Sequence, residues 1–555
     1  MYFTRFLAAL VILIATSIVL GASDQPHIIF ILADDLGFND VSFHGSSQIP
    51  TPNIDALAYS GIILNRYYVT PLCTPSRAAL MTGKYAIRTG MQHTVIYGME
   101  PRGLPLNETI LPQYLNQLGY QSHILGKWHL GHFKRVYTPL YRGFDSHVGY
   151  WTGHQDYYDH TAEESGVWGL DMRRGLDVAR DLHGKYTTDI VTEEAVHLIK
   201  NHNETKPLFL YLAHVAVHSG NPYNPLPAPD EVVAEMSHIE DYKRRRFAAV
   251  LTKLDRSVGE VVKALHDTNM LKNSIIIFST DNGGPAAGFN INAASNWPLR
   301  GVKNTLWEGG VRGAGLIWSP LLEQRERVSN QLMHITDWLP TLYSAAGGDV
   351  STLKDLDGLD LWPALSKNQN SPRNEALINI DDIWDSHGMV VGDYKVVKGT
   401  NYHGAWDNWY GPAGNRDPKS YNVENVHKSH AGSALHSLGL LPDDNKIREL
   451  RLNADINCSN ITSTSHCNPL EAPCLFNVVS DPCERHNLAK LYPTILNAIL
   501  DRLKYHNSTA LPPNNVPTDP RGDPRLWDYT WTNFDDYHLI EMEKEGITKH
   551  IAYLD

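Results

Sequence analysis

The sequence predicts an α/β protein in which a large, mostly parallel sheet is flanked by helices, with a smaller C-terminal domain of antiparallel sheet and helix. Short apolar segments without polar alternation are typical of strands buried on both faces, and four occur, at residues 27–33, 120–126, 207–213 and 274–280. Patterns typical of helices lie between them, at residues 111–118, 187–199 and 244–265. This alternation favours a sheet with helices on both faces.

The first 22 residues predict a signal peptide. Arg5 supplies a positive charge, residues 6–20 form an apolar run, and the small residues Gly21, Ala22 and Ser23 suit cleavage. The run is short for a membrane span, which takes about 20 residues, although an uncleaved anchor stays an alternative. We therefore expect a protein of the secretory pathway without stable membrane insertion.

A polar stretch at residues 366–374 predicts a domain boundary. We expect one large domain over residues 23–370 and a smaller one over residues 371–555. The smaller domain contains two segments typical of antiparallel strands and one typical of an amphipathic helix, at residues 375–381, 388–399 and 493–507. Residues 400–470 are rich in Gly, Asn, Ser and His, and we expect them to form loops.

The composition restricts the class of protein. The chain has 555 residues, of which 42% are hydrophobic and 20% charged, and this excludes a disordered chain or a fibrous repeat. The formal net charge of −13 argues against nucleic acid as a partner. Sequons for N-glycosylation, which suit a secreted protein, begin at Asn107, Asn203, Asn457, Asn460 and Asn507.

The five cysteines divide into a group of four and a single residue. Cys458, Cys467, Cys474 and Cys483 lie near the C-terminus and suit two disulfides in an oxidising compartment. We favour Cys474–Cys483 and Cys458–Cys467, while the other two connectivities stay open. Cys73 is left without a partner, and an odd cysteine in a secreted chain indicates a special role.

Polar and charged residues follow the four predicted parallel strands. They are Asp34 and Asp35 after the first strand, Lys127 and His129 after the second, His214 and His218 after the third, and Asp281 and Asn282 after the fourth. The carboxyl ends of parallel strands share one edge of a sheet, so these side chains should converge there. Three carboxylates and an amide favour a hard cation, Ca²⁺ or Mg²⁺. The alternative is that the aspartates only cap the helices that follow.

Cys73 lies where the sequence predicts a helix to begin. Thr74 is a good N-cap, Pro75 suits the first helical position, and Arg77 adds a positive charge one turn in. The N-terminus of a helix favours an anion. The alternative is a buried cysteine with only a structural role.

The string CTPSR at residues 73–77, followed by AALMTG, resembles the signature of the sulfatases. Further strings of that family follow in order: ADDLGFNDVSFHG at 33–45, TPNIDALA at 51–58, GKWHLG at 126–131, STDNGG at 279–284, NWPLRGVKNTLWEGGVRG at 296–313 and DPCERHNL at 481–488. The chain looks most similar to arylsulfatase B and related animal arylsulfatases. The resemblance makes residues 23–370 a catalytic domain.

The resemblance implies a modified residue and a metal. In sulfatases the cysteine of this signature is oxidised to formylglycine by a formylglycine-generating enzyme, which would be a partner of this chain during biosynthesis. One Ca²⁺ per chain is implied, with ligands at the matching positions Asp34, Asp35, Asp281, Asn282 and modified Cys73. Arg77 matches the arginine beside the formylglycine.

The remaining catalytic positions are also implied by the resemblance. Lys127 and Lys303 match the lysines that hold the sulfate oxygens, His129 matches the histidine beside the formylglycine, and His218 matches the histidine that faces the leaving group. One hydroxyl of the hydrated aldehyde attacks sulfur, while His218 or Lys303 protonates the departing oxygen. The second hydroxyl then loses a proton, which His129 can take, and expels sulfate.

Two histidines depart from the family pattern. Relatives have an apolar residue at the position of His214, and the sequence Ser-Gly-Asn-Pro after His218 argues against a helical His-x-x-x-His metal site. His154 occupies a position where relatives often carry a small residue, and it lies either in the substrate pocket or on the surface. The chain also lacks the additional cysteines that relatives carry in the catalytic domain.

The implied function is a sulfuric ester hydrolase. A glycan sulfate such as N-acetylgalactosamine 4-sulfate and a small sulfate ester, including dietary plant sulfates such as glucosinolates, are the alternative substrates. A phosphoesterase of the same superfamily and a secreted glycan-binding protein without activity are the competing functions. The enzyme would be secreted or lysosomal, and its oligomeric state stays open.

Overall fold

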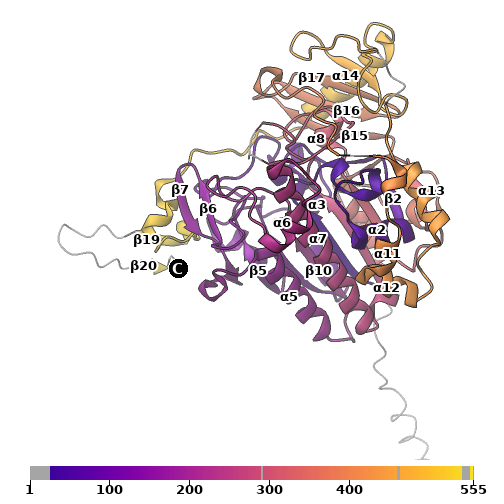
Figure 1. Ribbon diagram of the computed structural model, residues 1–555. Coiled ribbons are helices and arrows are strands. Elements are labelled where there is room, and N and C mark those ends of the chain that lie inside the picture. Colours follow the sequence, from indigo (N-terminus) through magenta and orange to yellow (C-terminus); the bar gives the residue numbers. More distant parts are fainter. Residues whose placement is uncertain (1–24, 289–291, 415, 459–462, 540–550, 554–555) are drawn as a thin grey trace, which may run out of the picture.

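The computed structural model describes residues 25–288, 292–414, 416–458, 463–539 and 551–553. The predicted signal peptide and the sequon at Asn460 lie outside these residues. Figure 1 shows a large sheet with helices packed against it and a smaller sheet above it. None of the helices in the described ranges combines the length and the apolar character that a bilayer span requires.

The large sheet confirms the predicted α/β fold. Within the described ranges its strands follow one another in this order: β13 (Arg327–Ser329), β2 (Ile62–Leu64), β12 (Gly315–Trp318), β11 (Ser274–Thr280), β1 (His27–Ala33), β10 (Leu208–Ala213), β4 (Gln121–Lys127), β5 (Ser146–Tyr150), β8 (Arg173–Arg174) and β9 (Asp177–Val178). The run from β11 to β5 is parallel, whereas β12 pairs antiparallel with β11 and with β2. All four strands expected from the sequence lie in the parallel run.

The register of the parallel strands brings their carboxyl ends level. Ala33 at the end of β1 pairs with Thr280 at the end of β11, and Ala213 at the end of β10 pairs with Gly126 of β4. The residues that follow each strand therefore emerge side by side at one edge of the sheet, as expected for ligand sites in α/β proteins.

Helices cover both faces of the large sheet. One layer contains α2 (Pro52–Ser60), α5 (Thr187–Lys200), α6 (Asp230–Glu235) and α7 (Tyr242–Asp267). The other contains α3 (Cys73–Thr82), α4 (Leu111–Gln117), α9 (Trp338–Ala345) and α10 (Trp362–Lys367). In β1, Ile29 and Ile31 are buried on the side of α7, while Ile28 and Phe30 are buried on the side of α3. Such apolar residues at every position are expected of a strand covered on both faces.

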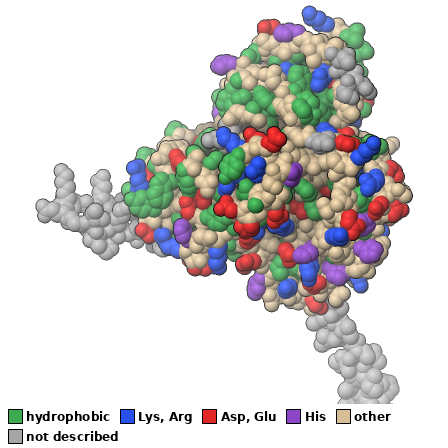
Figure 2. All heavy atoms as spheres, viewed as in Figure 1, with side chains coloured by type: hydrophobic (Ala, Val, Ile, Leu, Met, Phe, Trp, Pro, Cys, Tyr) green, Lys and Arg blue, Asp and Glu red, His purple; other side chains and the backbone are tan. Residues whose placement is uncertain are grey.

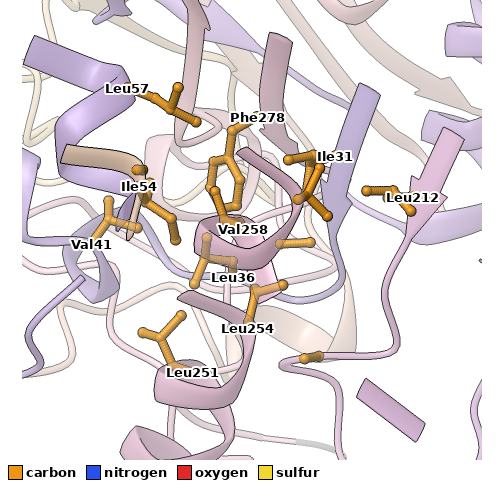
Figure 3. Close-up of a cluster of buried hydrophobic side chains, with 14 of the residues drawn as sticks. Ile31, Leu36, Val41, Ile54, Leu57, Leu212, Leu251, Leu254, Val258 and Phe278 are labelled. Atoms are coloured by element: carbon orange, nitrogen blue, oxygen red, sulfur yellow. The ribbon is translucent and has the colours of Figure 1, made fainter. Parts of the chain in front are cut away.

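Figure 3 shows the core beneath α7. Leu251, Leu254 and Val258 of α7 point toward Ile31 of β1 and Phe278 of β11. The spacing of three and four residues places the α7 side chains on one face of the helix.

The smaller sheet confirms the antiparallel C-terminal segments. It consists of β15 (Glu375–Asp381), β16 (Ser386–Val391), β17 (Tyr394–Lys398) and β18 (Cys474–Asn477), and α14 (Pro493–Ser508) packs on β15, β16 and β17. On the face that Figure 2 shows, hydrophobic side chains gather on this upper part, while acidic and basic side chains are interspersed over the larger part. The division of the chain at residue 370 stays a prediction.

The expectation of loops throughout residues 400–470 is wrong. The structure contains α11 (Glu424–Lys428), α12 (His430–Ser437) and α13 (Asp444–Ala454), and α12 packs against α2 and α7 of the larger domain. Ile447, Leu450 and Ala454 are buried in the main core at helical spacing. Asp443 caps α13 by accepting a hydrogen bond from the backbone N–H of Lys446. The helical spacing of these apolar residues and the capping aspartate are both present in the sequence, but the polar composition of residues 400–470 obscures them.

The favoured disulfide pairing is also wrong. The structure joins Cys458 to Cys483 and Cys467 to Cys474, with Cα–Cα distances of 6.4 and 5.9 Å. Cys474 starts β18 and is buried with Cys467 beside the small sheet, whereas Cys483 is buried with Phe38 of the larger domain. The intervening strand and turn carry the two cysteines into different clusters, which their proximity in sequence does not reveal.

Asp55 of α2 makes the stability of the fold depend on pH. Its carboxylate accepts hydrogen bonds from Tyr421 (2.6 Å) and Thr51 (3.0 Å), yet burial raises its pKa to about 7. Because the folded state binds this proton more tightly, the stabilisation from protonation is complete below the ordinary carboxyl pKa and is lost as the pH rises through 7.

We therefore expect Asp55→Asn to gain stability relative to the wild type as the pH rises from 4 to 8, by on the order of 3 kcal/mol. Thermal unfolding of both proteins across this range measures the difference. A difference in melting temperature that does not change with pH would contradict the assignment.

Candidate functional site

The carboxyl edge of the parallel strands brings the predicted polar residues together. Asp34 and Asp35 follow β1, and Cys73 begins α3 beside them. One carboxylate oxygen of each aspartate, the sulfur of Cys73 and a ring nitrogen of His218 all lie within 4.8 Å of one another, and all four residues are buried. Such a cluster of buried, acidic ligand atoms is a candidate metal centre.

Each of the three carboxylates at this edge is paired with a cation. Lys127 Nζ lies 2.6 Å from Asp34 Oδ2, and Lys303 Nζ lies 2.7 Å from Asp35 Oδ1. The Arg77 guanidinium lies 2.8 Å from Asp281 Oδ2 and 3.6 Å from Asp34 Oδ2. Burial raises the pKa of Asp35, but Lys303 and His218 together outweigh it and hold this pKa below the ordinary value.

The donor set fits a hard cation. Asn282 Oδ1 is buried and accepts no hydrogen bond from the described residues, although Asn282 Nδ2 donates to Asp35 Oδ1 at 2.8 Å. A buried carbonyl oxygen without a donor costs free energy unless another group satisfies it. With the Asp34 and Asp35 carboxylates, this oxygen forms the kind of set that Ca²⁺ prefers.

The third carboxylate, Asp281 at the end of β11, is also engaged in hydrogen bonds. Asp281 Oδ2 accepts both hydrogen bonds from Arg77, and Asp281 Oδ1 accepts one from the backbone N–H of Asp35. Asp281 therefore lies at the site with its oxygens engaged, while His218 is the residue that joins Asp34, Asp35 and Cys73 in the compact cluster.

Cys73 is the one described cysteine outside the disulfides, and it is buried. Its Sγ lies 3.6 Å from Asp34 Oδ1, and burial raises the pKa of the thiol. The helix begins two residues earlier than predicted, with Leu72 as its N-cap, and Thr74 does not cap it. Instead the Thr74 hydroxyl donates to the backbone carbonyl of His129 at 3.2 Å and so joins α3 to the segment after β4.

His129 and His218 both line the cavity. His129 Nε2 lies 3.0 Å from the carbonyl oxygen of Ile96, and burial lowers the pKa of its ring. His218 Nδ1 lies 2.7 Å from the carbonyl oxygen of Ser219, so Nδ1 carries a proton and donates it there. His218 Nε2 faces Lys303 Nζ at 3.3 Å and Asp35 Oδ2 at 3.5 Å.

The two unusual histidines differ in position. His214 is buried away from the cluster, with Nε2 3.4 Å from the hydroxyl of Ser257, and residues 214–218 form no helix. The ring of His154 stacks on that of His218, with centroids 6.0 Å apart, and His154 lines the same cavity as Cys73. The sequence left His154 either in the substrate pocket or on the surface, and the structure places it in the pocket.

A cavity of about 320 Å³ opens above Cys73. Cys73, His129, His218 and Lys303 lie on its walls, whereas Arg77 is fully buried beneath them. Sequence reasoning missed the outer wall, which consists of Tyr97, Glu163, Glu164, Asn304, Trp384 and Tyr402. Asn304 follows Lys303 within the string at residues 296–313. The other five residues carry no motif and come from loops and hairpins far apart in the sequence, so no local signal identifies them.

Comparison with known proteins agrees with this geometry. The family model described as Sulfatase matches residues 26–348. The chain is 41% identical over 514 residues to arylsulfatase J of Mus musculus, which covers 92% of this chain and 80% of the relative. It is 32% identical to N-acetylgalactosamine-6-sulfatase of Canis lupus familiaris, over 68% of this chain and 72% of the relative, and 30% identical to arylsulfatase A of Homo sapiens, over 69% and 77%.

Solved structures share the fold. The crystal structure of Ps i-CgsB in complex with k-i-k-neocarrahexaose has a TM-score of 0.69 and 26% identity, and it covers 91% of this chain and 97% of its own. The PsFucS1 sulfatase from Pseudoalteromonas sp. has a TM-score of 0.63 and 24% identity, over 89% and 92% of the two chains, and shows likeness of fold alone.

Proposed function

Because the chain belongs to the sulfatase family and is an enzyme that hydrolyses sulfate esters, we propose that it does so through a formylglycine made from Cys73 beside a bound Ca²⁺. The observation that carries this proposal is the position of Cys73. It is the unpaired cysteine, it begins α3, and its Sγ lies 3.6 Å from a carboxylate of the candidate metal centre at the floor of the cavity.

The metal would be held by Asp34, Asp35, Asn282 and modified Cys73, with Asp281 beside them. When bound, Ca²⁺ supplies positive charge that stabilises the sulfuryl oxygens as the S–O bond breaks. The orphaned Asn282 Oδ1 and the paired carboxylates support this assignment. The formylglycine hydrate supplies two hydroxyls, one to attack sulfur and one whose proton is later removed to expel sulfate.

The cations of the site would bind the sulfuryl group. Lys303 lines the cavity. Lys127 and Arg77 are buried and pair with Asp34 and Asp281, and Asp34 lies next to Cys73. In a site that excludes water, such fixed charges stabilise developing negative charge more than in solution. Arg77 also donates to the carbonyl oxygen of Lys127 at 3.3 Å, which joins two of the three cations.

His218 is suited to protonate the leaving group. Its Nδ1–H donates to the carbonyl oxygen of Ser219, and its Nε2 lies 3.3 Å from Nζ of Lys303, which lines the same cavity. A proton held on Nε2 could pass to the departing oxygen, and Lys303 is the alternative donor. His129 also lines the cavity and can accept the proton of the second hydroxyl.

We expect His218→Ala to lower kcat for alkyl or sugar sulfates by about 10²–10⁴-fold, the usual contribution of a general acid. The decrease in kcat for 4-nitrophenyl sulfate should stay below about 10-fold, because this leaving group departs without needing a proton. The control is His214→Ala, which removes a buried histidine outside the cavity. Equal losses for both substrate types would remove His218 from the acid role and favour Lys303.

The proposed substrates are a glycan sulfate, such as the N-acetylgalactosamine sulfates that named relatives process, or a small sulfate ester. The proposed location is the secretory pathway, with secretion or lysosomal delivery as its end. Asn107, Asn203 and Asn457 are exposed and Asn507 is half-buried, which supports glycosylation at the first three sites.

A further inference from the structure

Three of the residues in the outer wall of the cavity are aromatic. Tyr97, Trp384 and Tyr402 line it, from the loop after α3, the turn between β15 and β16, and the loop after β17. Tyr97 is 42% exposed and Tyr402 47% exposed, so part of each side chain is accessible to solvent. The Trp384 and Tyr402 ring centroids lie 6.3 Å apart, and the Tyr402 ring lies 4.1 Å from that of Trp406. Residues beyond 370 thus supply one side of a pocket whose floor is Cys73.

Hydrogen bonds hold these rings in place. Asp381 Oδ1 accepts from the backbone N–H of Trp384 at 3.2 Å, while Asp381 Oδ2 lies 2.8 Å from His93 Nδ1. The His93 ring then packs edge-on against the Trp384 ring, with centroids 4.7 Å apart. On the other loop, Asn304, the residue after Lys303, donates to the Tyr402 hydroxyl at 3.1 Å. The rings are therefore fixed to the segments that carry the site, which reduces the entropy cost of binding a ligand against them.

Two glutamates also line the cavity. Glu163 and Glu164 belong to β6 (Thr161–Glu164), which forms a hairpin with β7 (Val167–Leu170) and lines the cavity. Glu164 accepts hydrogen bonds from the backbone N–H groups of Gly98 and Gly153, and burial raises its pKa to about 7. Lys303 is the one lysine or arginine among the described residues that line the cavity, and it lies at the sulfate end beside Asp35.

We propose that the leaving group is a single uncharged ring, aromatic or sugar, which stacks on Trp384 and Tyr402, and that Glu163 disfavours substrates with a second anionic group. This inference rests on the proposed function, because it places the sulfate at Cys73. The cavity volume is at the lower end of the roughly 300–1,000 Å³ of small-molecule pockets, which suits one ring. Flat rings gain affinity from offset or edge contacts with aromatic side chains.

Selection against a second anionic group on the leaving group has a physical cause. A second carboxylate or sulfate on the leaving group would enter a partly desolvated wall beside Glu163 and meet no cation there. Like charges brought together in this way oppose binding and discriminate between ligands. Long polyanionic glycans would therefore be poor substrates.

A matched pair of substrates tests both parts. 4-Carbamoylphenyl sulfate and 4-carboxyphenyl sulfate have the same ring and nearly the same size but differ by one negative charge. We expect the wild type to prefer the amide at least about 10-fold in kcat/KM, mainly through KM, and the preference to shrink at high salt. Glu163→Gln should reduce the preference at least about threefold. A wild-type preference for the carboxylate, or one that Glu163→Gln leaves intact, would overturn the charge assignment.

Stacking is tested by Trp384→Ala, which should raise KM for both substrates about 10-fold, as expected for the loss of an aromatic contact and its buried area, with kcat within about threefold. Trp384→Phe, which keeps a ring, should restore most of the affinity. Tyr505→Ala serves as control, because Tyr505 is exposed on α14 and lies outside the cavity. An unchanged KM in Trp384→Ala would overturn the stacking assignment.

Failure of the proposed function has a different signature. If the reaction does not use Cys73, Cys73→Ala would still hydrolyse both substrates, and their ratio could still be measured. If the reaction uses Cys73 but the cavity walls do not discriminate between the two substrates, the wild-type ratio of their kcat/KM values would be close to one, and Cys73→Ala would be inactive.

Discussion

Cys73→Ala is expected to fold and to lose activity toward every sulfate ester by at least about 10³-fold. Loss of a covalent nucleophile removes the reaction path itself, and what remains is the stabilisation that the surrounding charges supply. In this site those charges are Arg77, Lys127 and Lys303, each already paired with a carboxylate. Steady-state assays with 4-nitrophenyl sulfate measure the loss.

Folding of this variant must be checked independently. Cys73 is buried at the start of α3, and alanine is smaller and suits a helix. We expect a melting temperature within a few degrees of the wild type. Cys73→Ser should also be inactive if the reaction needs two hydroxyls on one carbon, because serine supplies only one. Full activity in Cys73→Ala would contradict the proposed mechanism.

Removal of the metal is expected to lower activity at least about 100-fold, because the charge that a divalent cation supplies to a transferring group is worth several kcal/mol. Dialysis against a chelator should cause the loss. Ca²⁺ should restore activity, and Zn²⁺ should not be required, because the ligand atoms are oxygens. Metal analysis of the purified enzyme should find about one calcium per chain.

Asn282→Ala offers a residue-specific version of the same experiment. The substitution removes the buried Oδ1 that accepts no hydrogen bond from the described residues. We expect weaker Ca²⁺ binding and activity that recovers partly when excess Ca²⁺ is added. Asn65→Ala, at a buried asparagine outside the cavity, is the control. Stoichiometric zinc without an alkaline-earth ion, or unchanged Ca²⁺ affinity in Asn282→Ala, would contradict the metal assignment.

The sequence reveals those parts of this structure that depend on local pattern. The central strands are runs such as residues 27–33 that must be apolar at every position because helices cover both faces. Their parallel arrangement then brings Asp34, Asp281 and Lys127 to one edge without any further information. For that reason the floor of the site could be predicted.

The walls of the site depend on contacts between distant segments. Trp384 and Tyr402 lie more than 300 residues from Cys73 in sequence, and nothing in their spacing distinguishes them from other loop aromatics. The predicted disulfide pairing is wrong because it also depends on distant contacts: Cys483 packs with Phe38 rather than near Cys474.

Mass spectrometry of the tryptic peptide from residues 67–77, taken from the enzyme secreted by animal cells, tests the central claim most directly. The peptide contains Cys73 and ends at Arg77. Formylglycine would appear as the loss of one sulfur and two hydrogens and the gain of one oxygen, and its aldehyde would react with a hydrazide. We predict that this species is the main form in active enzyme. An unmodified Cys73 thiol throughout a fully active preparation would contradict the account.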